Sequence, residues 1–311
     1  MVEYARHVRH GRIRVAILGT GNIGIDLCER LLVDDDFEVV ALAGRRPDSP
    51  GLQRLVDRIP VIVTNGITGL LPHFDFFDGV FDATSSFDHP GHWDITKEHG
   101  KWMIDLTPSG IGRPMVPCLV DRVDSMHLSP GIEPENLSMI SCGGQSSAPM
   151  LNAITRGVSR ISEVEVSVSV PSLSVGPASR RNVDHYVEAT QELAAQVTGC
   201  PKAKAMLILN PADPPVMMRT TVFVQADIID LDAIRIACAE MITEVQKSVP
   251  GYDFAIEPYC PREGLVSVTS RVIGSGFYLP PYAGNLDIIN SAAVESARIL
   301  GQHHIRAKAQ T

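Results

Sequence analysis

The sequence lacks the features of several protein classes. It has no continuous apolar run of the roughly 18 residues that suggest a membrane span. The first residues, MVEYARHVRHGR, are polar and basic with no apolar stretch behind them, so we expect no secretory signal. An excess of positive charge is also missing, because the net charge is -9. This charge argues against a protein that binds nucleic acid phosphates.

Motifs for disulfides and metals are absent too. The 6 cysteines are scattered without CxxC spacing and no HExxH occurs, so we expect reduced thiols and a cytoplasmic protein. The segment HPGH places His89 and His92 three residues apart, without a third ligand nearby. We therefore interpret it as a solvated or hydrogen-bonding loop and predict no metal site.

What the sequence does contain is the pattern of a two-domain α/β protein. Hydrophobic residues make up 44% and charged residues 20% of its 311 residues, ordinary values for a globular protein with a core. The first half alternates apolar runs with helical stretches, which is typical of a parallel sheet with crossover helices. The predicted strands are 13–18, 37–43, 79–83 and 102–106, with a helix at 22–33.

The second half has a different pattern. Alternation of apolar and polar residues indicates strands with one solvated face at 164–170, 219–224 and 265–273. Helical spacing predicts helices from about Pro149 and at 183–197, 231–249 and 286–305.

The predicted fold is α/β, with a Rossmann dinucleotide-binding domain and a second α/β domain that has a mixed or antiparallel sheet. We assign the Rossmann domain to 1–141, completed by the C-terminal helix 284–311, which we expect to pack back on it. The second domain, 142–283, is predicted to carry catalysis and dimerisation.

A complete GxGxxG motif, Gly19-Thr-Gly-Asn-Ile-Gly24, follows a predicted strand and opens a helix. In that context the three glycines allow a tight turn, close approach of the backbone to phosphate, and close packing of helix on strand. The helix N-terminus adds unpaired N–H groups that favour an anion. We predict that this loop binds the pyrophosphate of a nicotinamide dinucleotide.

Two arginines follow the second predicted strand, where NAD enzymes carry an acidic residue that binds the ribose. Arg45 and Arg46 stand there, and Asp48 comes only after Pro47. Two guanidinium groups can bind a 2′-phosphate with bidentate hydrogen bonds, whereas the alternative is a pair of solvated loop charges. The pattern favours NADP over NAD.

Cys142 lies between a predicted strand and a predicted helix, next to two glycines, in Ser141-Cys-Gly-Gly-Gln145. A thiol at a helix N-terminus is expected to have a lowered pKa, and the N–H groups of Gly143 and Gly144 can bind an oxyanion. A lone cysteine is also commonly an inert buried residue. Beside a dinucleotide loop it becomes a candidate nucleophile, because a thiohemiacetal can release a hydride to nicotinamide.

Motifs along nearly the whole chain resemble those of the acylating, CoA-dependent acetaldehyde dehydrogenases. They are GTGNIG, FDATSS, IDLTPSGIG, SCGGQSSAPM, SVGPASRRN, ILNPADPPVMMR, VPGY and YLPPYAGNLDI. Enzymes of this family convert a short aldehyde and CoA to acyl-CoA, often in complex with a 4-hydroxy-2-oxovalerate aldolase. The resemblance implies a homodimer, NAD or NADP as cofactor and CoA as co-substrate.

The resemblance also implies site residues. Cys142 would form the acyl thioester, Asn182 would lie close to the thiol, and Thr220 takes the position of a residue thought to assist the nucleophile. The cofactor-binding residues, including the two arginines argued above, are Gly19, Thr20, Gly21, Asn22, Ile23, Gly24, Arg45, Arg46, Ser174, Val175, Gly176, Pro177, Ala178, Ser179, Arg180, Arg181, Asn182 and Asn285.

The chain departs from the family pattern at three places. The family has aspartate after MMR, where this chain has Thr220, and a hydroxyl cannot act as a base near neutral pH. The aspartate that ends the family's second strand is replaced by arginine. The segment between VPGY and YLPPYAG is shorter than in the family, which would alter contacts with a second subunit or an aldolase.

Three functions are compatible with these features. The first is an NAD(P)-dependent acylating aldehyde dehydrogenase that uses Cys142. The second is a phosphorylating semialdehyde dehydrogenase-like enzyme, which needs a catalytic histidine such as His185. The third is a dinucleotide-binding partner subunit whose catalysis has weakened, a reading that Thr220 motivates.

Overall fold

The computed structural model describes residues 11–128, 133–176, 180 and 182–309, with the backbone alone at 305–309. The chain divides into two compact units. Unit 1 comprises Met1–Arg113, Leu128–Ser138 and Ala293–Thr311, and unit 2 comprises Pro114–His127 and Met139–Ala292. Among the described residues, no helix is long and apolar enough to cross a membrane.

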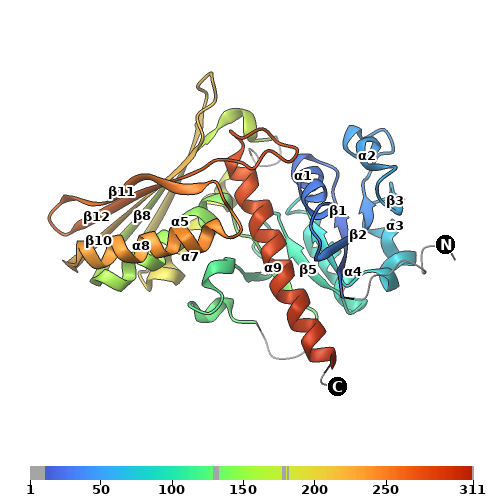
Figure 1. Cartoon of the computed structure of the whole chain (residues 1–311), viewed down its shortest axis with the longest axis horizontal. Helices are drawn as coiled ribbons and strands as arrows, with labels where there is room; N and C mark the ends of the chain where they lie inside the picture. Colours follow the sequence, from blue (N-terminus) through green and yellow to red (C-terminus); the bar gives the residue numbers. More distant parts are fainter. Residues whose placement is uncertain (1–10, 129–132, 177–179, 181, 310–311) are drawn as a thin grey trace. The chain divides into compact units, whose positions relative to one another are not determined.

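A seven-stranded sheet in the order β3-β2-β1-β4-β5-β7-β6 forms the centre of unit 1 (Figure 1). The strands are β1 (Ile13–Leu18), β2 (Phe37–Ala43), β3 (Val61–Val63), β4 (Gly79–Asp82), β5 (Trp102–Asp105), β6 (Arg113–Pro114) and β7 (Asn136–Ser138). Strands β1 to β5 and β7 pair in parallel. The apolar residues of β1 are buried because helices cover both faces of such a sheet. The order β3-β2-β1-β4-β5 is that of a Rossmann fold.

The helices of unit 1 connect these strands. They are α1 (Asn22–Leu31), α2 (Pro50–Leu55), α3 (Ile67–Leu70) and α4 (His89–Glu98), with a 3-10 helix at Leu71–Phe76. The last helix, α9 (Gly284–Ala309), belongs to unit 1 from Ala293 onward. Arg298 on α9 forms ion pairs with Asp34 and Asp36, and its guanidinium lies over the ring of Phe37.

A five-stranded mixed sheet in the order β11-β12-β10-β8-β9 forms unit 2 (Figure 1). The strands are β8 (Val158–Pro171), β9 (Ala203–Asn210), β10 (Met218–Ile229), β11 (Tyr252–Arg262) and β12 (Leu265–Val272), and only β8 and β9 pair in parallel. Helices α5 (Cys142–Ile154), α7 (Val183–Thr198) and α8 (Leu231–Gln246) pack on this sheet. Short 3-10 helices lie at Pro117–Leu119, Asp124–Met126, Thr155–Gly157 and Ser172–Ser174.

Alternation along the strands decides which face of the mixed sheet the helices cover. Val164, Val166, Val168 and Val170 of β8 are buried and pack in one core with apolar residues of α5, α7 and α8. The residues between these valines point to the opposite face, because the side-chain period of a strand is two. The mixed sheet therefore has one helix-covered face and one face that polar residues share with exposed apolar ones.

The predicted fold class, a Rossmann domain plus a second α/β domain with a mixed sheet, is confirmed. The helix predicted from about Pro149 starts earlier, at Cys142. Two glycines and a proline disfavour a helix. They are tolerated here because the Ser141 side chain caps the first turn and most of the helix is buried in the core of unit 2.

Candidate functional site

A cleft of about 660 Å³ lies in unit 1 at the carboxyl ends of β1, β2, β3 and β4. It spans the point where the strand order reverses between β1 and β4, which is where open parallel sheets bind ligands. Its lining residues are Leu18, Gly19, Thr20, Gly21, Ala43, Gly44, Arg45, Arg46, Ser49, Asn65, Gly66, Ile67, Ala83, Thr84, Asp88 and His92.

The glycine loop forms one wall of this cleft. Gly19 has a φ of +119°, and a Cβ at this position would lie 2.5 Å from the Ala83 carbonyl oxygen. Gly24 lets α1 pack closely, since a Cβ there would lie 2.1 Å from the Gly19 carbonyl oxygen. At Gly21, the residue that precedes α1, a Cβ would have nothing within 4 Å. The backbone at Gly21 is therefore open to a ligand, while residues 22–24 form the first turn of α1.

Arg45 and Arg46 both line the cleft with exposed side chains. The Arg45 guanidinium lies 3.6 Å from the Asp88 carboxylate, and that of Arg46 lies 3.4 Å from Asp48. Ion pairs at such exposed positions are weak, so both guanidinium groups can turn to another anion at little cost.

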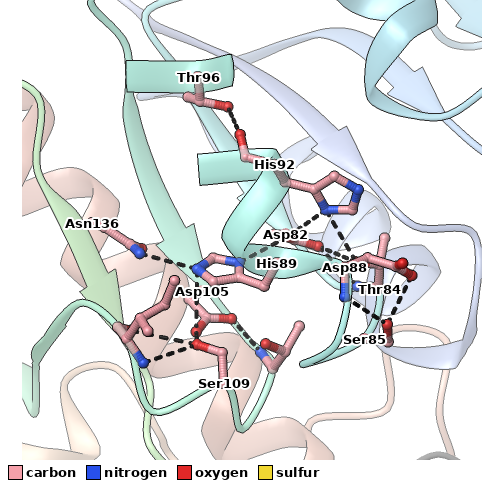
Figure 2. Close-up of polar contacts among 12 residues, drawn as sticks. Asp82, Thr84, Ser85, Asp88, His89, His92, Thr96, Asp105, Ser109 and Asn136 are labelled. Atoms are coloured by element: carbon pink, nitrogen blue, oxygen red, sulfur yellow. Dashed lines mark hydrogen bonds and ion pairs between the residues drawn. The ribbon is translucent and has the colours of Figure 1, made fainter. Parts of the chain in front are cut away.

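A buried polar cluster adjoins the cleft (Figure 2). Asp82 at the end of β4 accepts hydrogen bonds from Nδ1 of His89 and Nδ1 of His92, each at 2.8 Å. On the other side of the His89 ring, Nε2 lies 3.0 Å from the Asn136 amide and 3.5 Å from Asp105 Oδ2 (Figure 2). The expectation of a loop at HPGH is wrong, because both histidines belong to α4, and His89 is fully buried.

In this cluster, burial and the neighbouring charges shift the pKa values of Asp82 and His89 in opposite directions. Burial raises the pKa of Asp82, but hydrogen bonds from His89 and His92 outweigh it and bring the pKa to about 2. Burial lowers the pKa of His89, yet the carboxylates of Asp82 and Asp105 raise it above its ordinary value. Asp105 is so enclosed that burial raises its pKa to about 6.

Cys142 is the first residue of α5 in unit 2, and its side chain is half-buried. Ser141 precedes the helix, and its Oγ accepts a hydrogen bond of 2.8 Å from the Gly144 N–H. The expectation that the Gly144 N–H binds an oxyanion is therefore wrong, because the helix cap uses it. At Gly143, a Cβ would lie 2.4 Å from the Tyr186 hydroxyl oxygen.

The pKa of the Cys142 thiol is not lowered, although the thiol lies at a helix N-terminus. Burial raises the pKa of the Cys142 thiol to about 11, while the Tyr186 hydroxyl and the Gly143 N–H offset this rise only in part. The expectation of a lowered pKa is thus wrong for the protein alone, since desolvation outweighs the helix N-terminus.

Tyr186 is a site residue that the sequence reasoning missed. Its hydroxyl lies 3.4 Å from the Cys142 sulfur, and its ring comes from the part of α7 that faces α5. Tyr186, Thr190, Leu193 and Val197 recur at helical spacing on the packed side of α7. A tyrosine on the packed side of a helix usually needs a hydrogen-bond partner for its hydroxyl. Its place at this spacing is the sequence signal for a contact between Tyr186 and another buried residue.

Thr220 occupies a buried position on β10, where its Oγ1 lies 2.6 Å from the Ser146 hydroxyl oxygen. Ser146 stands one helical turn after Cys142 on α5 and donates to the Gly143 carbonyl at 3.2 Å. Thr220 is thus joined to the first turn of α5 through Ser146.

The remaining predicted residues of unit 2 lie around the segment 172–182. Ser174 Oγ is 2.7 Å from Asn285 Oδ1, which unites two predicted residues that are 111 positions apart. Arg180 donates to backbone carbonyls of its own turn at Ser172 and Val175, and the Gly176 carbonyl accepts from its N–H. Asn182 precedes the first turn of α7. Pro177, Ala178, Ser179 and Arg181 lie outside the described residues.

Comparison with known proteins agrees with these features. Residues 142–280 match the family model described as prokaryotic acetaldehyde dehydrogenase, dimerisation. An acetaldehyde dehydrogenase of Geobacillus stearothermophilus is 38% identical, with 96% of this chain and 99% of the relative covered. One from Burkholderia pseudomallei is 39% identical over 93% of this chain and 95% of the relative, and one from Pectobacterium atrosepticum is 38% identical over 91% and 94%. The chain therefore belongs to the acetaldehyde dehydrogenase family.

Proposed function

We propose that the protein is an NAD(P)-dependent acylating aldehyde dehydrogenase, which converts a short aldehyde and CoA to acyl-CoA through a thioester on Cys142. Its relatives are named acetaldehyde dehydrogenases, which supports a small aldehyde as substrate. The observation that carries the proposal is Cys142 at the first position of α5, with a tyrosine hydroxyl 3.4 Å from its sulfur.

The cleft of unit 1 fits a dinucleotide. Its open backbone at Gly21 and the start of α1 suit a pyrophosphate, because N–H groups at a helix N-terminus favour anions. Arg45 and Arg46 on its rim suit a 2′-phosphate, which supports NADP over NAD. When bound, the nicotinamide supplies the hydride acceptor for the oxidation.

Cys142 has two roles in this proposal. Its sulfur first forms a bond to the aldehyde carbon, while the aldehyde oxygen takes up the proton that the thiol loses. After that carbon has lost a hydride and the oxygen a proton, an acyl thioester remains on Cys142. The CoA sulfur then attacks the thioester carbonyl, and Cys142 leaves and regains a proton.

An assay of NAD(P)H absorbance with acetaldehyde and CoA tests this function. We expect turnover in the native protein and none in Cys142→Ala, while Cys200→Ala, which alters a buried cysteine two residues after α7, should stay active. Full activity in Cys142→Ala would sink the proposal.

Thr220 favours a second candidate function, a dinucleotide-binding subunit with weakened catalysis. Its hydroxyl is bound to Ser146 and cannot replace the family's carboxylate as a base. A native kcat in the ordinary range of about 1–10³ s⁻¹ contradicts this function. A large gain of activity in Thr220→Asp supports it. By contrast, His185 of the phosphorylating alternative is exposed on α7, whereas Tyr186 faces Cys142.

The open face of the mixed sheet is the surface that we assign to a homodimer. Strand pairing places residues of all five strands in rows across this face. One row is Met206, Ser167, Thr221, Thr269 and Ile256, and the next is Lys204, Glu165, Phe223, Ser267 and Tyr259.

Two properties of these rows support a second copy of the chain as the partner. Apolar side chains lie at both edges of this face, Met206 on β9 and Ile256 with Tyr259 on β11, and each is 39% or more exposed, which suits contact with another protein surface. Glu165 and Lys204 put both signs of charge on one face, as a two-fold self-complementary contact needs. The matching family model is also described as a dimerisation region. An aldolase partner stays a prediction from the resemblance.

A further inference from the structure

Two polar contacts fix the beginning of α5 against α7. Ser141 Oγ lies 2.7 Å from Thr190 Oγ1, and Cys142 Sγ lies 3.4 Å from Tyr186 Oη. The cap residue and the first residue of α5 thus meet Thr190 and Tyr186, which are four apart on α7 and share one face of that helix. Because the two contacts set the register together, the Tyr186 hydroxyl is held at the sulfur by the packing of the helices.

The hydrogens available on each group decide which atom donates in these two contacts. Thr190 Oγ1 donates its single hydrogen to the Tyr186 carbonyl at 2.7 Å, so the Ser141 hydroxyl donates to Thr190. Across the 3.4 Å contact between Tyr186 Oη and Cys142 Sγ, either atom can be the donor while the sulfur is a thiol. Once the sulfur has lost its proton, the Tyr186 hydroxyl is the one atom of this pair that carries a hydrogen to donate.

The absence of a side chain at Gly143 leaves room for the Tyr186 hydroxyl. A Cβ there would lie 2.4 Å from Tyr186 Oη and 2.9 Å from a Val168 methyl group. Any other residue at this position would push the phenol away from the helix terminus. The sequence Cys-Gly therefore makes room for the tyrosine beside the thiol.

We propose that Tyr186 is a catalytic residue of this site, whose hydroxyl donates a hydrogen bond to the Cys142 sulfur as that sulfur loses its proton. The inference rests on the proposed function, in which Cys142 is the nucleophile. Tyr186 gives up no proton in the step and forms no bond to carbon. It stabilises negative charge on the sulfur while the S–C bond forms, and again when CoA displaces Cys142 from the thioester.

The test measures the reactivity of Cys142 without aldehyde, CoA or nucleotide. Iodoacetamide reacts with thiolates, and the peptide that contains Cys142 is followed by mass spectrometry at pH 8. All variants carry Cys260→Ser, because Cys260 is exposed and would consume reagent. Tyr186→Phe removes the hydroxyl alone. Tyr252→Phe is the matched control, since its buried hydroxyl also binds α5, at the Ser146 carbonyl, without touching the sulfur.

We expect Tyr186→Phe to slow alkylation of Cys142 roughly three- to tenfold. A lost hydrogen bond to a charged group lowers the thiolate fraction by more than this, but the more basic thiolate is a better nucleophile. Tyr252→Phe should alkylate within about twofold of the parent, since its hydroxyl does not touch the thiolate. Equal or faster alkylation in Tyr186→Phe overturns the inference.

Turnover separates this inference from the proposed function. Slow alkylation together with a matching fall in kcat/KM supports a catalytic Tyr186, whereas slow alkylation with unchanged kcat/KM contradicts it. If Cys142→Ala retains full turnover, the proposed function fails. That result does not depend on the alkylation comparison, which uses no substrate.

Discussion

At the scale of single residues, Cys142 shows that position in a helix does not decide reactivity alone. A rise in the thiol pKa from 9.0 to about 11 corresponds to about 3 kcal/mol against the thiolate. A helix N-terminus favours a charge by about 0.3–1 kcal/mol at exposed sites. Desolvation therefore wins, and the thiolate needs further help from a neighbour such as Tyr186.

Arg45 and Arg46 lead to a prediction on cofactor choice. The double substitution Arg45→Ser with Arg46→Ser should lower kcat/KM for NADP by more than about 10-fold, because even one lost hydrogen bond to a charged phosphate is worth about 1.5–3 kcal/mol. The value for NAD should change much less. Steady-state kinetics with both nucleotides measure the effect, with Arg160→Ser, an exposed residue of unit 2, as control. An equal loss for both nucleotides would show that the arginines do not read the 2′-phosphate.

At the scale of elements, the buried cluster joins parts of unit 1 that are far apart in the sequence. His89 begins α4, Asp82 ends β4, Asp105 ends β5 and Asn136 begins β7. His89 lies between the carboxylates of Asp82 and Asp105, which raise its pKa, and so ties these ends together. Removing the His89 ring takes one partner from each of these two buried carboxylates, and losing one partner of a buried pair costs more than the intact pair contributes.

We predict that His89→Gln lowers the free energy of unfolding by about 3–5 kcal/mol at pH 7. Urea unfolding monitored by circular dichroism measures this loss, with His185→Gln on the exposed side of α7 as control. A loss similar to that of the control would show that the cluster is not a structural tie.

The shifted pKa values of the cluster predict how its contribution depends on pH. Asp82 has a lowered pKa, so its contribution is present above pH 4 and is lost as pH falls through about 2. His89 has a raised pKa, so its contribution is present below pH 6.5 and is lost as pH rises through the folded-state value. Asp105, with a pKa of about 6, favours the folded state increasingly as pH falls from above 6 toward 4.

The difference in stability between the native protein and a form without the cluster should be largest between about pH 4 and 6. A difference that grows steadily from pH 5 to pH 9 would contradict this assignment of charges.

The elements also show what the sequence could predict. Strands such as β1 and β2 could be predicted with their bounds because both are apolar runs of a buried parallel sheet, each interrupted by one charged residue. Strand β9 was missed although it alternates, since its outward residues include exposed apolar side chains at Met206 and Ile208. The start of α5 was misplaced because its stability comes from a cap and from burial, which local propensity does not report.

In the candidate site, too, some residues could be predicted from the sequence and others could not. The glycine loop and Cys142 are local motifs, so their residues could be named from the sequence. Within unit 2, Tyr186 meets Cys142 across 44 positions, and Ser146 meets Thr220 across 74. Within unit 1, strand order assembles the cluster around His89. No local sequence pattern specifies these contacts. The shift in the thiol pKa likewise depends on burial that only the folded chain reveals.

At the scale of the whole molecule, the open face of the mixed sheet predicts the oligomeric state. Ile256→Glu combined with Met206→Glu should convert a dimer to a monomer, because four unpaired carboxylates would be buried in a two-fold contact. Analytical ultracentrifugation measures the mass. Ile236→Glu is the matched control, since Ile236 is 63% exposed on α8, which lies over the other face. A dimer that survives the double substitution would place the interface elsewhere.

The central claim is that Cys142 carries the acyl group, and the most direct test is to trap that group. The protein is incubated with acetaldehyde and NADP⁺ without CoA, digested at acidic pH to preserve thioesters, and the peptide that contains Cys142 is weighed by mass spectrometry. We predict an acetyl group on Cys142 that disappears when CoA is added before the digest, with acetyl-CoA formed in equal amount. An unmodified Cys142 in protein that turns over acetaldehyde and CoA would contradict the account.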